Sequence, residues 1–332
     1  MRFVILVPAG VRTGGPEACH QLCDTLLAQG FDASIWFLDE ADLRNLQQRL
    51  QRGPSLAATG CEVGSKNATI PEYAHYRVSE FTRFQSGEMV TFVIPELFVW
   101  ALPAFIGLPV LVWWLSVDNA FGALSMINLN FLRTPLVRHA AQCEYVSAFT
   151  ASLGLCASPL SDYTVIPEGH RIPLVERPRR VAFNAGKKNI FDMNHLGQQL
   201  QATCPGVELI PLVNMAREQV FELFGAARLY VDLGNFPGKD RMAREALALG
   251  ANVVIASAGA GSSGIDHPWP ECYRLDPHRT EALAALIGHM VNHPDVHVPL
   301  FDKARENIRG ERSVFQEQVL ALFSTLLTPI RH

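Results

Sequence analysis

Short apolar runs alternate along the chain with longer segments in which apolar residues recur every three or four positions. The runs have the length of buried strands, and the periodic segments have the pattern of helices that pack one face on a sheet. In the first half the predicted order is strand 2–8, helix 16–29, strand 32–38, strand 89–95, an apolar helix over 95–107 and strand 109–115. Strands joined by crossover helices are typical of a parallel, doubly wound sheet.

The second half repeats the alternation more regularly. We expect strands at 180–185, 206–213, 228–234 and 252–257, helices at 190–203, 215–227 and 239–250, and a long amphipathic helix over 311–327. A segment rich in proline and charge suggests a linker at about 170–180. The predicted fold is therefore α/β, with two tandem Rossmann-like doubly wound domains facing a cleft. Their expected bounds are 1–172 and 178–310, with 311–332 as a C-terminal helix that packs back on the N-terminal domain.

Two apolar stretches need a choice between alternatives. Residues 97–115 carry no charge and are long enough to span a membrane, but Pro103, Gly107 and Pro109 interrupt them. A helix, a tight turn and a buried strand explain the stretch better. The first residues lack a small-residue cleavage site, so we expect a first strand rather than a signal peptide. Residues 40–88 have no clear pattern.

Composition narrows the function classes. With 332 residues, 48% hydrophobic and 18% charged, the chain suits two folded globular domains. A net charge of −4 gives no support to nucleic-acid binding through a broad basic face. The seven cysteines include no Cys-x-x-Cys pair and suggest a cytoplasmic protein with buried or free thiols. Cys19, His20 and Cys23 resemble part of a metal site, but core cysteines are the favoured interpretation.

The densest chemistry lies in the segment DLGNFPGKDRMAREALALG, residues 232–250. A strand ends there, a turn with Gly238 follows, and a helix begins near Lys239. The unpaired N–H groups of a helix N-terminus attract phosphate, and Lys239 and Arg241 add positive charge to it. Arg244 and Glu245 share the helix face of Arg241. Cations at a diphosphate and a carboxylate at a ribose suit a nucleotide, whereas the alternative is a solvated helix face with local Arg–Glu pairs.

The continuation EALALGANVVIAS resembles the donor-binding segment of GT-B glycosyltransferases, in which Glu-Ala-x-Ala-x-Gly precedes a Pro-Val-Val strand. The resemblance implies that Glu245 binds the nucleotide ribose. It also implies donor binding by Gly238, Lys239, Arg241 and Arg244. Many retaining members carry a second glutamate eight residues earlier, where this chain has Pro237. That departure leaves the contact to the transferred sugar unassigned.

Three other stretches resemble the same family. RTGGPEACHQLC matches its first loop and helix and implies a phosphate or acceptor loop at Gly14 and Gly15, with Glu17 in the first helical turn. VAFNAGKKN matches the strand after the linker and implies that Lys187 and Lys188 bind the diphosphate, although exposed loop lysines are an equal alternative. YTVIPEGHRI matches the end of the first domain, with Glu168 in place of the usual asparagine.

The family implies a transferase that uses a nucleotide-sugar as substrate, with no further cofactor and no metal, and no Asp-x-Asp motif is present. The expected acceptor is a saccharide or a lipid-linked saccharide of bacterial surface polysaccharide synthesis. A lipid-linked acceptor implies peripheral association with the inner face of the membrane. The alternatives are a non-catalytic GT-B-like subunit that binds a partner transferase or a glycan, and a nucleotide-sugar epimerase.

Several residues of the first domain are weaker candidates. Asp118, in WWLSVDNAFG, is the best placed carboxylate for a catalytic base or an acceptor contact, although a turn aspartate that caps the next segment is the slightly favoured interpretation. His139 and His170 are further candidates, and the adjacent tryptophans at 113 and 114 are expected in the core. We expect residues 257–264 to form a flexible loop.

Overall fold

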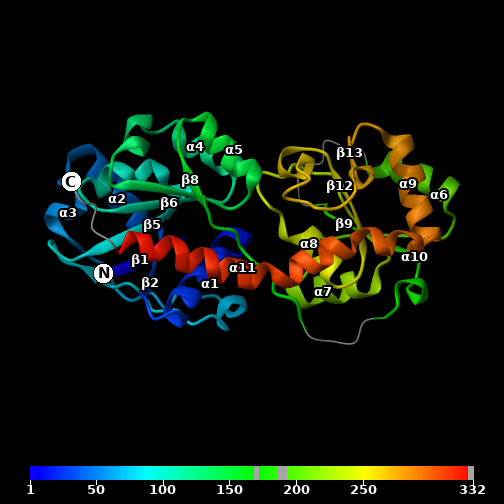
Figure 1. Ribbon diagram of the computed structural model, residues 1–332, viewed down its shortest axis with the longest axis horizontal. Coiled ribbons are helices and arrows are strands. Elements are labelled where there is room, and N and C mark those ends of the chain that lie inside the picture. The colour runs from blue at the N-terminus through cyan, green and yellow to red at the C-terminus, as the bar shows by residue number, and fades with distance from the viewer. Residues whose placement is uncertain (168–171, 186–192, 328–332) are drawn as a thin grey trace. The chain divides into compact units, whose positions relative to one another are not determined.

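The computed structural model describes residues 1–167, 172–185 and 193–327 (Figure 1). The chain divides into two compact units. Unit 1 comprises Met1–Asp162 and Ser313–His332, and unit 2 comprises Tyr163–Arg312. Each unit contains one main sheet, and the predicted linker at 170–180 overlaps residues outside the described ranges.

Unit 1 is built on a six-stranded parallel sheet in the order β2-β1-β5-β6-β7-β8. Strands β5 and β6 are buried at every position, as expected for a sheet covered on both faces. The strands are β1 (Arg2–Pro8), β2 (Asp32–Leu38), β5 (Val90–Pro95), β6 (Val110–Trp114), β7 (Val137–Ala141) and β8 (Ala157–Pro159). A short antiparallel ribbon pairs β3 (Cys61–Glu62) with β4 (Arg83–Phe84).

The helices of unit 1 connect these strands. Helix α1 packs Leu22 and Leu26, both fully buried, against the sheet. The helices are α1 (Gly14–Ala28), α2 (Glu40–Arg52), α3 (Leu56–Thr59), α4 (Val117–Leu124) and α5 (Glu144–Ser152), with 3₁₀ segments η1 (Pro71–Tyr73), η2 (Glu96–Phe105) and η3 (Leu129–Arg133).

Helix α2 lies in the stretch that showed no clear pattern. Its N-cap is Asp39, whose carboxylate accepts hydrogen bonds from the amides of Ala41 and Asp42, both at 2.9 Å. The Asp42 carboxylate accepts in return from the Asp39 amide at 3.2 Å. This reciprocal cap starts the helix, although few apolar side chains such as Leu46 mark its buried face.

The apolar stretch forms η2, which contains Pro103, followed by the buried strand β6. This confirms the predicted helix, turn and strand. Within the ranges that the structure describes, no helix combines the length and the apolar character needed to cross a membrane.

Unit 2 is built on a five-stranded parallel sheet in the order β10-β9-β11-β12-β13. The strands are β9 (Arg180–Phe183), β10 (Glu208–Pro211), β11 (Leu229–Asp232), β12 (Asn252–Ala256) and β13 (Arg274–Leu275). The four predicted strands are confirmed. The fifth was missed because two residues are too few to show a sequence pattern.

The helices of unit 2 include the three that were predicted between its strands and two after residue 279 that were not. They are α6 (Met193–Thr203), α7 (Arg217–Ala226), α8 (Arg241–Ala248), α9 (Thr280–Asn292) and α10 (Pro294–His297), with 3₁₀ segments η4 (Leu174–Glu176), η5 (Gly259–Ser262), η6 (Glu271–Tyr273) and η7 (Val298–Phe301). Helix α11 (Asp302–Leu326) begins in unit 2, and its residues from Ser313 belong to unit 1 (Figure 1). It starts earlier than the predicted 311.

The expectation of a flexible loop at 257–264 is wrong. Its centre is the 3₁₀ segment η5, in which the Ala260 amide donates to the Phe236 carbonyl at 2.8 Å. Gly259 has φ +56°, and a Cβ atom there would lie 2.2 Å from the same carbonyl oxygen. The backbone therefore packs tightly on the loop before α8, and glycine is required at this position.

Both sheets have the same topology. In each, the first strand lies between the second and the third in chain order, so the connections change direction beside it. This switch point lies between β1 and β5 in unit 1 and between β9 and β11 in unit 2. Open α/β sheets bind ligands at the carboxyl ends of the strands next to the switch point. Two Rossmann-like doubly wound units, as predicted, are confirmed.

Candidate functional site

A buried polar cluster lies at the switch point of unit 2. Asn184 follows β9 and donates from Nδ2 to Oδ2 of Asp232, the last residue of β11, at 3.1 Å. Asp232 is fully buried and also accepts from the Tyr230 hydroxyl at 3.0 Å and the Gly234 amide at 3.1 Å. Burial and the Asp232 charge raise the pKa of Tyr230, so its hydroxyl stays a donor. These bonds fix the backbone where β11 enters the loop before α8.

Helix α8 begins directly after that loop. Asp240 is its N-cap and accepts from the Met242 amide at 2.9 Å. Gly238 is buried in the loop, and Arg241, the first helical residue, is 9% exposed. Since Arg244 and Glu245 are buried as well, the alternative of a solvated helix face is wrong. The predicted charged residues lie inside unit 2.

Two of the predicted cations share a carboxylate from α11. The Lys239 Nζ lies 3.0 Å from Oε1 of Glu311, and Nη1 of Arg244 lies 2.7 Å from its Oε2. Arg244 is 1% exposed and also donates to the carbonyl oxygens of Asp240 at 3.1 Å and Lys239 at 3.0 Å. Arg244 therefore braces the loop from within. Glu311 lies far from α8 in the chain, so no local sequence pattern connects the two.

Glu245, the residue predicted to bind a ribose, lies beside a second cation that sequence reasoning missed. Its Oε1 is 3.4 Å from Nη2 of Arg217, the first residue of α7. Like Arg241, Arg217 places a positive charge at a helix N-terminus, where the helix dipole disfavours it. An arginine as the first residue of a helix is visible in the sequence once the starts of α7 and α8 are recognised.

The first loop of unit 1 lies at the other switch point. Gly14 and Gly15 open α1, with Thr13 as N-cap. A Cβ atom on Gly15 would meet only Leu115 Cδ1, at 3.8 Å, so the fold itself leaves room for a side chain there. Glu17 is buried and accepts from the Tyr76 hydroxyl at 2.9 Å. The role of this loop in ligand binding stays a prediction.

Asp118 is the second residue of α4 and is exposed. Sequence reasoning missed the buried carboxyl beside it. Glu96, directly after β5, accepts from the Leu115 amide at 2.8 Å and from Nδ2 of Asn119 at 3.4 Å. Burial raises the pKa of Glu96 to about 7, against the lowering effect of these hydrogen bonds. A carboxyl that titrates near neutrality thus fixes the turn that carries Asp118.

The remaining candidates divide by location. Lys187, Lys188, Glu168 and His170 lie outside the described residues. Trp113 and Trp114 are both fully buried, which confirms the prediction that they lie in the core. His139 is also buried, with its ring nitrogens 3.1 Å from Trp114 Nε1 and 2.9 Å from the Leu132 carbonyl oxygen. It belongs to the packing of unit 1.

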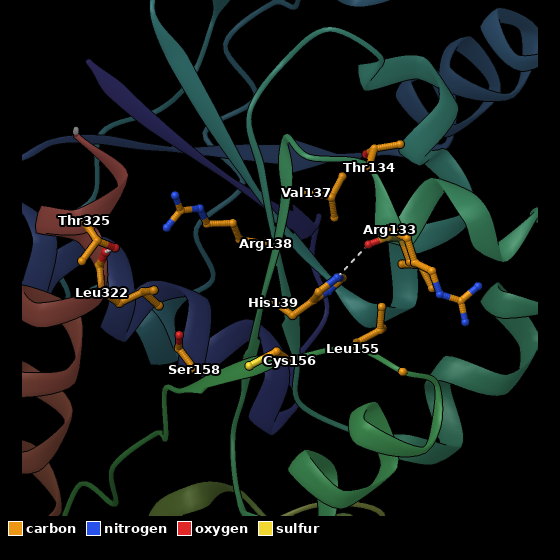
Figure 2. Close-up of a pocket in the computed structure, with 12 residues that line it drawn as sticks. Arg133, Thr134, Val137, Arg138, His139, Leu155, Cys156, Ser158, Leu322 and Thr325 are labelled. Carbon is orange, nitrogen blue, oxygen red and sulfur yellow. Dashed lines mark hydrogen bonds between the residues drawn. The ribbon is translucent and has the colours of Figure 1, made fainter. Parts of the chain in front are cut away.

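A cavity of about 480 Å³ lies at the opposite edge of the unit 1 sheet. Its walls come from residues at and just before the starts of β7 and β8, together with Leu322 and Thr325 of α11, so it lies toward the amino ends of these strands, away from the switch point. Figure 2 shows Arg133 and Arg138 extending to opposite sides of His139. Since the guanidinium groups do not converge, this cavity does not form an anion site.

The described ranges contain no group of three or more His, Cys, Asp or Glu side chains placed to hold a metal ion. Cys19 and Cys23 are buried in the core, in agreement with the favoured interpretation. Burial raises the pKa of Cys23 to about 12, which keeps it a neutral thiol.

Comparisons with protein-family models and with curated proteins found no match. Among solved structures, sucrose-phosphate synthase from Thermosynechococcus elongatus is similar with a TM-score of 0.63 at 13% identity, over 98% of each chain. TarM from S. aureus, solved with fondaparinux, alpha-GlcNAc-glycerol and UDP, has a TM-score of 0.62 at 10% identity, over 97% of this chain and 100% of that one. HepE from Anabaena, solved with UDP and glucose, has a TM-score of 0.57 at 15% identity, over 98% of this chain and 100% of that one. At these identities the likeness establishes the fold across both units.

Proposed function

We propose, from the GT-B fold that the chain shares with these structures, that the protein is a glycosyltransferase. Unit 2 takes a nucleotide-sugar donor at its switch point, and unit 1 takes an acceptor at its own. The acceptor is a saccharide or a lipid-linked saccharide of bacterial surface polysaccharide synthesis. The protein then acts in the cytoplasm or in peripheral contact with the inner face of the membrane.

The observation that carries the proposal is the charge around α8. Arg241 starts this helix and Arg217 starts α7, while Lys239 lies in the loop between β11 and α8. Two of these cations, Arg241 and Arg217, oppose helix dipoles, which is costly, although Glu245 pairs with Arg217 and Glu311 pairs with Lys239. A bound diphosphate offsets that cost. Two of the similar structures, HepE and TarM, were solved with UDP, which supports a nucleotide diphosphate as the ligand class.

In the proposed reaction, the bond between the sugar C1 and the diphosphate oxygen breaks, and a bond between C1 and an acceptor oxygen forms. The diphosphate leaves with the electron pair of the broken bond. Lys239 and Arg241 stabilise the negative charge that develops on it, with Lys187 and Lys188 as further candidate contacts. Asp118 takes the acceptor proton. Glu245 accepts from the ribose hydroxyls, and side-chain cations rather than a metal ion neutralise the diphosphate.

A second candidate function is a non-catalytic subunit of the same fold that binds a partner transferase or a glycan. Pro237 favours it, because proline offers no side-chain group to the sugar at a position where many retaining members of the family carry glutamate. Such a subunit need not retain nucleotide binding at α8.

The first test is thermal unfolding with UDP, GDP, dTDP, CMP and ADP. A ligand at about one hundred times its Kd adds about 2.7 kcal/mol to the free energy of unfolding. We expect one base to give a clear rise in Tm, and Lys239→Ala and Glu245→Ala to abolish it. Lys303→Ala is the matched control, since Lys303 is exposed on α11 and pairs only locally with Glu306.

The outcomes separate the two functions. A base-selective shift that is lost in both site variants and kept in the control supports the donor site and identifies the nucleotide. The absence of any shift with all five nucleotides contradicts the donor site and favours the non-catalytic subunit.

A further inference from the structure

Glu311 holds four groups of unit 2 with one carboxylate. Its Oε1 accepts from Lys239 Nζ at 3.0 Å, and its Oε2 lies 2.7 Å from Arg244 Nη1. The same Oε2 accepts from the Thr164 amide at 3.0 Å and from the Thr164 hydroxyl at 2.9 Å. Glu311 and Thr164 are 6% and 7% exposed, so the carboxylate itself is shielded from water.

The cluster joins three segments that are far apart in the sequence. Thr164 follows directly after the residue at which the chain enters unit 2, and Glu311 precedes the residue at which the chain leaves it. Lys239 and Arg244 belong to the loop and helix of the proposed donor site. One carboxylate therefore ties the donor loop to both chain segments that connect unit 2 to unit 1.

The two cations differ in how firmly they are held. Arg244 is 1% exposed and has two further bonds to backbone carbonyls, so it stays in place. The Lys239 side chain is 19% exposed, and its long flexible stem allows the ammonium group to reach other partners. An anion that binds at the start of α8 competes with Glu311 for this ammonium group.

We propose that Glu311 is a positioning residue that competes with the diphosphate of the donor for Lys239. The inference rests on the proposed function. In the free protein Glu311 holds Lys239, and a bound diphosphate draws Lys239 away while Glu311 keeps Arg244 and Thr164. Binding therefore breaks a contact of Glu311, next to the place where α11 leaves unit 2. Glu311 thereby lowers the affinity for the donor. It also couples donor binding to the two segments in which the chain enters and leaves unit 2.

The test is calorimetric titration of the five nucleotides, UDP, GDP, dTDP, CMP and ADP, into wild type and Glu311→Gln. The glutamine carbonyl still accepts from Arg244 and Thr164, whereas its amide no longer pairs with Lys239. We expect an affinity gain of about tenfold for the diphosphates, the scale of one typical coupling between sites. The gain should be absent for uridine and adenosine, which carry no phosphate, and absent when Lys239→Ala is added to Glu311→Gln.

Two further variants keep the test decisive. Glu306→Gln removes an exposed carboxylate of the same helix, 68% exposed, and should leave affinity unchanged. If Glu311→Gln does not fold, Glu311→Asp keeps a buried negative charge for Arg244 and shortens the side chain by one methylene group, which moves the carboxylate away from Lys239. It should give the same gain for diphosphates over nucleosides.

Failure of the inference and failure of the proposed function give different results. Equal or weaker diphosphate binding in a folded variant overturns the inference, while binding by wild type keeps the proposed function. Binding by Glu311→Gln but not by wild type supports both. If neither protein binds any nucleotide, both are overturned.

Discussion

Buried charged side chains are held by contacts from distant parts of the chain. Asp232, Glu311 and Glu96 each accept hydrogen bonds from at least two different residues. A buried carboxylate without such donors is costly, so each one fixes the groups around it. Asp232 and Glu96 do this at the carboxyl ends of strands, where the proposed ligands bind.

Glu96 gives a prediction on pH and stability. Its pKa is about 7 in the folded protein against the ordinary value of 4.5 for glutamate, so the folded state binds its proton more tightly than the unfolded state. This contribution is fully present below about pH 4.5 and is lost as pH rises through about 7. Across this range it amounts to about 3 kcal/mol.

Urea unfolding of wild type and Glu96→Gln from pH 5 to pH 8 tests this prediction. The stability of wild type relative to the variant should fall as pH rises. Glu40→Gln, at an exposed position of α2, is the control for loss of a carboxylate. Parallel pH profiles of wild type and Glu96→Gln would show that Glu96 does not titrate in this range.

At the scale of elements, the loop between β11 and α8 is determined by its neighbours. The Asp232 cluster fixes its start, Asp240 caps the helix at its end, and η5 packs on its middle at Phe236. Because the loop is held at three points, the backbone of Lys239 and Arg241 has a fixed position. A preorganised phosphate site requires such fixed positions.

Gly259→Ala tests the contact between η5 and this loop. The added methyl group would lie 2.2 Å from the Phe236 carbonyl oxygen at a φ of +56°. We expect a loss of about 2 kcal/mol in the free energy of unfolding and weaker nucleotide binding, measured by urea unfolding and calorimetry. Gly225→Ala in α7 is the matched control: nothing lies within 4 Å of the new methyl group, so stability should be kept or slightly improved. Equal stabilities of the two variants would contradict the tight contact.

At the scale of the whole molecule, the chain forms two units with separate sheets and separate cores. Unit 2 contains an unusual internal brace, Arg177, which is 2% exposed. It donates to four backbone carbonyls, those of Ile172, Phe224, Ala227 and Leu249. These acceptors belong to three different segments, so one side chain holds them together.

Arg177→Met should therefore destabilise unit 2 specifically. Leaving several buried carbonyls unpaired costs about 3 kcal/mol or more in total. Calorimetry should show a lower Tm for the transition of unit 2 and an unchanged one for unit 1. Arg179→Met is the control, because Arg179 makes an exposed bond to the Pro205 carbonyl. Equal effects of both variants would exclude the bracing role.

Local pattern was sufficient for most elements. Strands β1 and β2 have the predicted bounds, and in unit 2 the central strands differ from prediction only at their ends, because apolar runs and flanking turns carry the signal in a few adjacent residues. Helix α2 was missed because it depends on a reciprocal cap with few buried apolar residues, and strand β13 was missed because it has only two residues. Strands β7 and β8 and helices α4, α5 and α9 were not predicted either.

The sequence by itself predicted the two doubly wound sheets and the cluster of charged residues at 239–245, because both are recognised from residues that are close together in the chain. Only the tertiary structure decided their partners. Lys239 and Arg244 meet Glu311, and Glu245 meets Arg217, through contacts that no local pattern records. Likewise, the burial of Glu96, which makes it a candidate site residue, depends on the pairing of β5 with β6 in the folded sheet. Burial and charge pairing arise between distant segments, so they appear only after the chain has folded.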